Sequence, residues 1–400
     1  MLILKRVFGG KVGTGGSLFI PGQLLAAMFK WDSEIPLSQI EGILLRATGN
    51  AEKAGTLFDA KGFLVQVQMS EQIYLRQPKK TFNVVTSLSV LVNDRWFPRF
   101  FHLRTVNNSQ VTFLKKRPQD FQLSPSAFLE PGQYEKDLEG KVFVRIKTTA
   151  RTHIEAVNTA LWDLDLLRGI WNLFINHGSF TFSIGGLPKP CNEILRGPYI
   201  TAQIIGVYQS IQDYVNTSFV PSLPLPTSLD RDPDKILDLE RKTRRKVRSQ
   251  PWKEKLMDWI VLYCRSLDLS DRHNSFLGLW QALEMMTITE GERHEEIPKR
   301  VSWLYNDWEF ERIIVDVLRE YRNEAVHRAR EIPGDEYIVS ELRRHVENVL
   351  RFYLFNGLKI KSLSEARDLL KTPSDLERVL SELNKYKKSS KFRSYGKTVE

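Results

Sequence analysis

Residues 308–328 read WEFERIIVDVLREYRNEAVHR, and their spacing predicts the fold of the C-terminal half of the chain. The apolar side chains of this stretch recur every three or four residues, as in a helix that buries one side. They are Phe310, Ile313, Ile314, Val317, Leu318, Tyr321 and Ala325. We therefore predict an amphipathic helix whose apolar stripe packs on a core.

Three polar residues near the end of this helix carry chemistry: Arg322, Asn323 and His327. At about 100° per residue, Arg322 and His327 lie roughly 140° apart around the helix axis, on opposite edges of the stripe. Asn323 and His327 are four residues apart and share one side. Two such helices packed together would gather a guanidinium, an amide and an imidazole in one cleft.

These groups suit the cleavage of RNA without a metal ion. An imidazole that titrates near neutral pH accepts a proton from a ribose 2′-hydroxyl or donates one to the leaving oxygen. A guanidinium binds phosphate through two parallel hydrogen bonds and stabilises developing negative charge. Asn323 would hold the phosphate or fix the imidazole tautomer. The alternative is a chance spacing of arginine and histidine in a basic helical protein.

The segment Arg322-Asn323-Glu324-Ala325-Val326-His327 resembles the Arg-Asn-x-x-x-His motif of the HEPN superfamily. Residues 275–284, SFLGLWQALE, look like the second-helix signature of its ApeA-like branch, and the resemblance covers roughly residues 253–359. It implies an all-helical domain that forms a homodimer with facing motifs and cleaves RNA to a 2′,3′-cyclic phosphate. It also implies a setting in anti-phage defence, abortive infection or toxin action.

Three functions remain open at this point. The first is a homodimeric HEPN endoribonuclease, with Arg322, Asn323 and His327 as catalytic residues. The second is a catalytically silent HEPN module that binds RNA or another protein. The third is a structural or regulatory protein in which Arg322 and His327 only serve packing.

Two carboxylates are candidate supporting residues. Glu284 is expected either to position Arg322 from the neighbouring helix or to face solvent. Glu324 falls inside the apolar stripe by helical phase, where an unpaired charge is costly, so we expect it to pair with an arginine. His345 is expected at the surface, or as part of an RNA-binding rim.

The charge of the chain favours a polyanionic partner. The net charge is +10 and the pI is about 9.4. One run concentrates positive side chains, which are candidate RNA-binding residues, with a solvated linker as the alternative. They are Arg241, Lys242, Arg244, Arg245, Lys246 and Arg248.

The predicted fold class is α+β, with a mostly β N-terminal region and a C-terminal all-α HEPN-type bundle. The segments are 1–150 (mostly β, a candidate sensor), 151–218 (mixed α/β), 219–250 (proline-rich and basic linker), 251–360 (HEPN-like helices) and 361–400 (C-terminal helix and basic tail). Strands are predicted at 63–69, 82–92, 141–147, 180–184 and 199–207. Helices are predicted at 152–176, 207–215, 252–263, 276–286, 308–328, 338–354 and 364–385.

Several functions are disfavoured by the sequence. No apolar run is long enough to cross a bilayer, and the N-terminus is not a convincing signal peptide, so we expect a cytoplasmic protein without a membrane partner. Two cysteines support neither a disulfide framework nor a zinc site, and we predict no metal and no cofactor. The run Gly9–Gly16 lacks the Ser or Thr that must follow the lysine of a phosphate-binding loop. A phage-derived or other protein trigger at the N-terminal region is the remaining expected partner.

Overall fold

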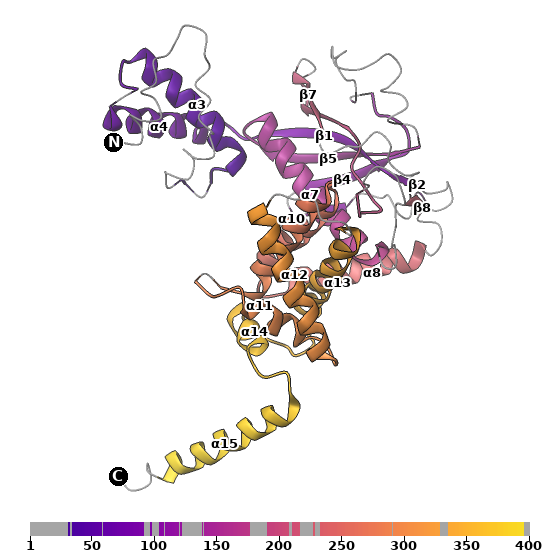
Figure 1. Cartoon of the computed structure of the whole chain (residues 1–400). Coiled ribbons are helices and arrows are strands. Elements are labelled where there is room, and N and C mark those ends of the chain that lie inside the picture. Colours follow the sequence, from indigo (N-terminus) through magenta and orange to yellow (C-terminus); the bar gives the residue numbers. More distant parts are fainter. Residues whose placement is uncertain are drawn as a thin grey trace.

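The computed structural model describes residues 31–32, 34–57, 59–91, 97, 104–107, 109–119, 121, 138, 140–176, 190–207, 210–216, 227–228, 233–289, 291–328 and 335–395. A six-stranded antiparallel sheet, a helical bundle and an N-terminal helical hairpin make up this part of the chain (Figure 1). The predicted α+β class and the helical C-terminal region are therefore confirmed.

The strands of the sheet come from two parts of the chain, residues 80–150 and residues 199–215. They are β1 (Lys80–Leu88), β3 (Arg104–Val106), β4 (Ser109–Leu114), β5 (Val142–Ala150), β6 (Tyr199–Ile204) and β7 (Gln212–Val215), in the order β3-β4-β5-β1-β6-β7. Two short strands, β2 (Val90–Leu91) and β8 (Thr227–Ser228), pair in parallel. The helix predicted at 207–215 is wrong, because residues 212–215 form the edge strand β7.

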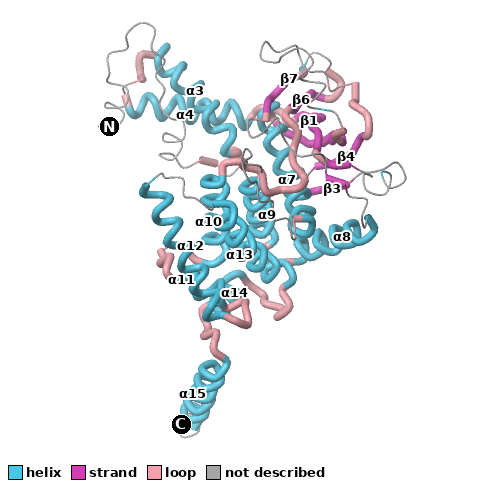
Figure 2. Tube along the Cα trace, turned by 45° about the vertical axis from the view of Figure 1, so that its right-hand side comes forward, coloured by secondary structure: helices cyan, strands magenta, loops and turns pink. Residues whose placement is uncertain are grey.

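Helix α7 (His153–Ile175) lies between the sheet and the bundle (Figures 1 and 2). The Thr152 hydroxyl caps its start by accepting a hydrogen bond from the Glu155 amide, as the N-cap position of a helix favours. Its residues from Asp163 to Leu173 are buried on all sides, including polar ones such as Asp163 and Arg168. One continuous core therefore runs from the sheet through α7 into the bundle.

The bundle consists of α9 (Lys253–Leu267), α10 (Arg272–Thr287), α11 (Glu296–Ser302), α12 (Trp308–Arg328) and α13 (Asp335–Phe355). Their predicted positions are confirmed, except that α11 was not predicted. The helix predicted at 364–385 is two helices, α14 (Leu363–Leu370) and α15 (Leu376–Tyr395). Pro373 lies in the break, where it cannot donate a helical hydrogen bond. Helix α15 projects away from the bundle in both views.

The mostly β interpretation of the N-terminal region is wrong for residues 37–75. Helices α3 (Leu37–Lys53) and α4 (Ala60–Leu75) form a hairpin with its own small core. The predicted strand at 63–69 lies inside α4, whose buried residues are Phe63, Val67, Ser70 and Tyr74. That spacing is helical, so packing against α3 outweighs the β preference of the apolar run.

The basic run is not part of an irregular linker. It lies in α8 (Pro233–Ser249), which packs on α7 and α9 through the buried residues Glu240, Thr243 and Val247. The glycine run Gly9–Gly16, the strand predicted at 180–184 and the prolines of 219–226 lie outside the described residues. Among the described helices, none combines the length and apolarity needed to cross a bilayer.

Candidate functional site

Arg322 and Asn323 lie side by side near the end of α12. The Arg322 Nη1 donates to the Asn323 Oδ1 at 3.3 Å, and Asn323 is exposed. The Arg322 side chain keeps 28% of its surface exposed, so part of the guanidinium faces solvent. A phosphate could reach this guanidinium without any unfolding of the helix.

Glu284 connects Arg322 to α10. Its Oε1 lies 3.6 Å from Arg322 Nη2, accepts a hydrogen bond from Trp280 Nε1 at 2.5 Å, and lies 2.8 Å from His294 Nδ1. One carboxylate oxygen therefore contacts groups from three segments of the bundle: α10, the residues before α11, and α12. Of the two placements expected for Glu284, the structure shows the contact with Arg322, and the positioning role stays a prediction. His294 was not a predicted member of the group, and only the tertiary fold brings it to Glu284.

His327 follows Asn323 by one helical turn. The backbone of α12 continues through residue 328, so the backbone positions 323 and 327 share one side of the helix. The side chain of His327 lies outside the described residues. The structure therefore describes the side chains of Arg322 and Asn323, but only the backbone position of His327.

Glu324 is exposed, which corrects the expectation that it lies in a buried stripe. The apolar side chains of α12 do not all face the bundle. Ile314, Val315, Leu318 and Tyr321 face the bundle, where the Tyr321 ring meets Phe276 edge-on at a centroid distance of 4.7 Å. Phe310, Ile313 and Val317 keep 57%, 63% and 56% of their surfaces exposed. The motif-bearing helix thus carries an outer apolar row, defined here as Phe310, Ile313 and Val317.

The candidate RNA-binding residues of α8 differ in burial. Arg244 is half-buried, donating to Glu240 Oε1 at 3.1 Å and to the Thr105 carbonyl at 2.6 Å. Arg248 is exposed and also donates to the Thr105 carbonyl, at 3.0 Å. The others are exposed: Arg241, Lys242, Arg245 and Lys246. In Figure 2, α8 and α12 lie on different sides of the bundle, so the basic run is not on a helix beside the motif.

His345 is fully buried, which corrects its predicted surface position. Its Nδ1 lies 2.9 Å from the Tyr305 hydroxyl and its Nε2 lies 3.7 Å from the Glu311 carboxylate. Burial, together with the nearby Arg344 charge, lowers the pKa of His345 to about 3. The imidazole is therefore neutral at physiological pH and serves packing rather than RNA binding.

Asp165, Cys264 and Asp268 form a buried group with the atom types of a metal site. The guanidinium of Arg168 lies among them, with Nη2 at 2.6 Å from both Asp165 Oδ1 and Asp268 Oδ2. A cation thus already neutralises the carboxylates, and burial raises the pKa of the Cys264 thiol well above its usual value. These residues do not fit a metal ion. They bind α7 to α9 instead.

Comparison with protein-family models, curated proteins and solved structures finds no match to this chain.

Proposed function

We propose that this protein is a metal-independent endoribonuclease with Arg322, Asn323 and His327 in the catalytic cleft. The observation that carries the proposal is the partly exposed Arg322 guanidinium, held by Glu284 on one helix and Asn323 on its own. Side chains fixed in this way are ready to bind phosphate at little conformational cost. The HEPN resemblance of residues 322–327 supports the same assignment.

In the proposed reaction, one His327 removes the proton of a ribose 2′-hydroxyl and the 2′ oxygen attacks the adjacent phosphorus. The bond to the 5′ oxygen breaks, the products are a 2′,3′-cyclic phosphate and a 5′-hydroxyl, and the second His327 donates the proton to the leaving oxygen. Arg322 stabilises the charge that develops on the phosphate. The two histidines require two copies of the chain.

The outer apolar row of α12 supports a second copy. Phe310, Ile313 and Val317 recur at intervals of three and four residues, on the helix that bears Arg322. Burying each against a partner would contribute on the order of 1 kcal/mol or more. A dimer formed through this row would bring two α12 helices together.

The charge of the chain supports RNA as the substrate. The exposed basic residues of α8 would bind the flanking RNA backbone at a distance from the cleft, because they lie on another side of the bundle. From the resemblance we further propose a cytoplasmic role in anti-phage defence, abortive infection or as a toxin, with the N-terminal region as the sensor of a trigger.

A non-catalytic interaction module is the second candidate, and one observation favours it. Glu284 already neutralises part of the Arg322 charge, while large apolar side chains stay exposed on α12. A partner protein would cover the outer apolar row in that case, and Arg322 would serve the α10–α12 contact only.

The test is incubation of the purified full chain with total RNA in EDTA, with mapping of the new RNA ends. We expect cleavage that leaves 2′,3′-cyclic phosphates and that is lost in Arg322→Ala and in His327→Ala. Arg312→Ala is the matched control, since Arg312 is an exposed arginine on the same helix. RNA binding without cleavage by the wild type would favour the non-catalytic module, and cleavage that persists in both motif variants would refute the assigned residues.

A further inference from the structure

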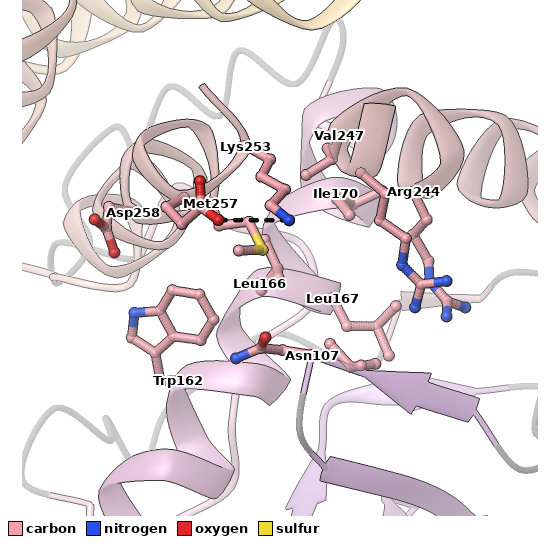
Figure 3. A pocket seen from close by; sticks show the side chains of 13 residues that line it. Asn107, Trp162, Leu166, Leu167, Ile170, Arg244, Val247, Lys253, Met257 and Asp258 are labelled. Atoms are coloured by element: carbon pink, nitrogen blue, oxygen red, sulfur yellow. Dashed lines mark ion pairs between the residues drawn. The ribbon is translucent and has the colours of Figure 1, made fainter. Parts of the chain in front are cut away.

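A pocket of about 490 Å³ lies at the junction of the sheet and the bundle (Figure 3). Helices α7, α8 and α9 and the turn between β3 and β4 form its walls. This volume is within the range of sites that bind small molecules. None of the motif residues on α12 lines it, so the pocket is separate from the proposed RNA cleft.

The floor of the pocket is apolar. Leu166, Leu167 and Ile170 of α7 are buried beneath it, while Trp162 of α7 and Met257 of α9 are half-buried at its side. An indole ring and a thioether are favourable surfaces for a flat ring. This floor therefore favours a ligand with a planar, largely apolar portion.

Charged groups of both signs line the pocket, including a Lys253–Glu254 ion pair between its two ends. Figure 3 places Arg244 at one end and Asp258, with Trp162, at the other. Arg248 also lines the pocket, and Lys253 approaches from α9 with its Nζ 3.5 Å from Glu254 Oε1. The Thr105 carbonyl accepts hydrogen bonds from both Arg244 and Arg248, which holds the two guanidiniums in place. Each guanidinium has five N–H donors, so each keeps donors for an anion.

We propose that this pocket binds a free mononucleotide. Its phosphate would lie against Arg244 and Arg248, and its base would lie on Trp162 and Met257. An exocyclic amino group of the base would donate to the Asp258 carboxylate. A bare anion would leave the apolar floor unused, and a purely apolar ligand would leave the guanidiniums and the carboxylate without a partner from the ligand.

Such a ligand would contact α7, α8, α9 and Asn107 of the β3–β4 turn at once. Because only the folded chain forms this site, binding would stabilise the junction between sheet and bundle. The inference does not depend on RNA cleavage and is tested without it.

The test is calorimetric titration of the full chain with AMP, GMP, CMP and UMP, and separately with the nucleosides and with inorganic phosphate. We expect binding of the mononucleotides that carry an amino group, with UMP weaker because it lacks one. Nucleosides and phosphate should bind at least about tenfold more weakly, since each loses one half of the site. Absence of mononucleotide binding at about 1 mM would overturn the proposal.

Substitutions in the pocket test whether the mononucleotide binds there. Arg248→Glu should weaken mononucleotide binding at least about tenfold, and Met257→Trp should weaken it by filling the pocket. Asp258→Ala should abolish the preference of CMP over UMP. Lys235→Glu is the matched control, since it reverses an exposed charge on the same helix outside the pocket. Equal losses in Arg248→Glu and Lys235→Glu, or binding of short RNA without binding of mononucleotides, would overturn the proposal.

Discussion

At the scale of single residues, burial decides what a titratable group can do. Glu284, partly exposed beside Arg322, is placed to position the guanidinium that we propose as functional. His345, which has the same formal chemistry as the proposed general base His327, is sealed off and held neutral. Burial therefore excludes His345 from proton transfer to or from a ligand in solution.

Asp163 gives a prediction at this scale. The side chain is fully buried in α7, and burial raises its pKa to about 6, with Ser109 and Asn107 offsetting this only in part. The unfolded chain loses this proton near pH 3.8, so the contribution of Asp163 to folded stability falls as pH rises from about 3.8 to 6. An asparagine at this position does not ionise, so the variant does not lose this stability as the pH rises. The variant should gain up to about 3 kcal/mol relative to wild type between pH 4 and pH 8.

Urea unfolding at the two pH values measures this difference. Asp163→Asn should increase the free energy of unfolding by more at pH 8 than at pH 4. An unchanged difference would mean that Asp163 is ionised across the whole range in the folded protein.

At the scale of elements, the crossing of α7 and α9 depends on Gly169. A Cβ at this position would lie 2.7 Å from Ile260 Cγ2 and 2.9 Å from the Ile260 carbonyl oxygen. Gly169→Ala should therefore push the helices apart and destabilise the protein by roughly 1–3 kcal/mol, despite the better helix propensity of alanine.

Gly42 of α3 is the matched control for this change. No atom lies within 4 Å of a Cβ built at Gly42, so Gly42→Ala should stabilise the hairpin by roughly 0.5–1 kcal/mol. Thermal unfolding of both variants checks the pair. A stabilising Gly169→Ala would show that the two helices can separate without cost.

The outer apolar row of α12 gives the second prediction at this scale. Ile313→Asp places a charge in the middle of the proposed dimer contact, where it would be desolvated, so we expect the dimer to dissociate. Light scattering on the eluting protein should show half the wild-type mass. Leu358→Asp is the control, because Leu358 is similarly exposed at a turn outside α12. A wild-type protein that is monomeric at all concentrations would contradict the dimer.

At the scale of the whole molecule, a buried network joins the sheet to the bundle. Asp268, at the end of α9, accepts from Arg168 Nη1 at 3.0 Å and from Asn192 Nδ2 at 2.7 Å. Arg168 also donates to the Ile194 carbonyl in the segment before β6. Sheet, central helix and bundle are therefore expected to unfold together.

Asp268→Ala tests this cooperativity. The variant leaves the buried Arg168 charge with one carboxylate fewer, and we expect a loss of roughly 3–5 kcal/mol. Hydrogen exchange should speed up in the sheet as well as in α9 and α10. Lys299→Ala, which removes an exposed ion pair with Glu296, should cost less than about 1 kcal/mol. Faster exchange confined to the bundle would show that the two halves unfold separately.

The sequence by itself determined where the central helix, four helices of the bundle and the three middle strands of the sheet lie. The apolar spacing of 152–176, 252–263, 276–286, 308–328 and 338–354 is regular enough to predict α7, α9, α10, α12 and α13, because helical periodicity is a local property. The strands β1, β5 and β6 follow from local runs of β-branched and aromatic residues. By the same criterion residues 63–69 were predicted as a strand, but they lie in helix α4. A short apolar run is compatible with a helix or a strand until the element that it packs against is known.

Only the tertiary structure decided which side of each element is covered. Phe310, Ile313 and Val317 belong by spacing to one stripe with Leu318, yet the bundle covers Leu318 and leaves the other three exposed. The group formed by Glu284, His294 and Arg322, the burial of His345 and the packing of the basic run in α8 likewise depend on segments far apart in the chain. Contacts of this kind form when separate elements pack together, and no local spacing encodes them.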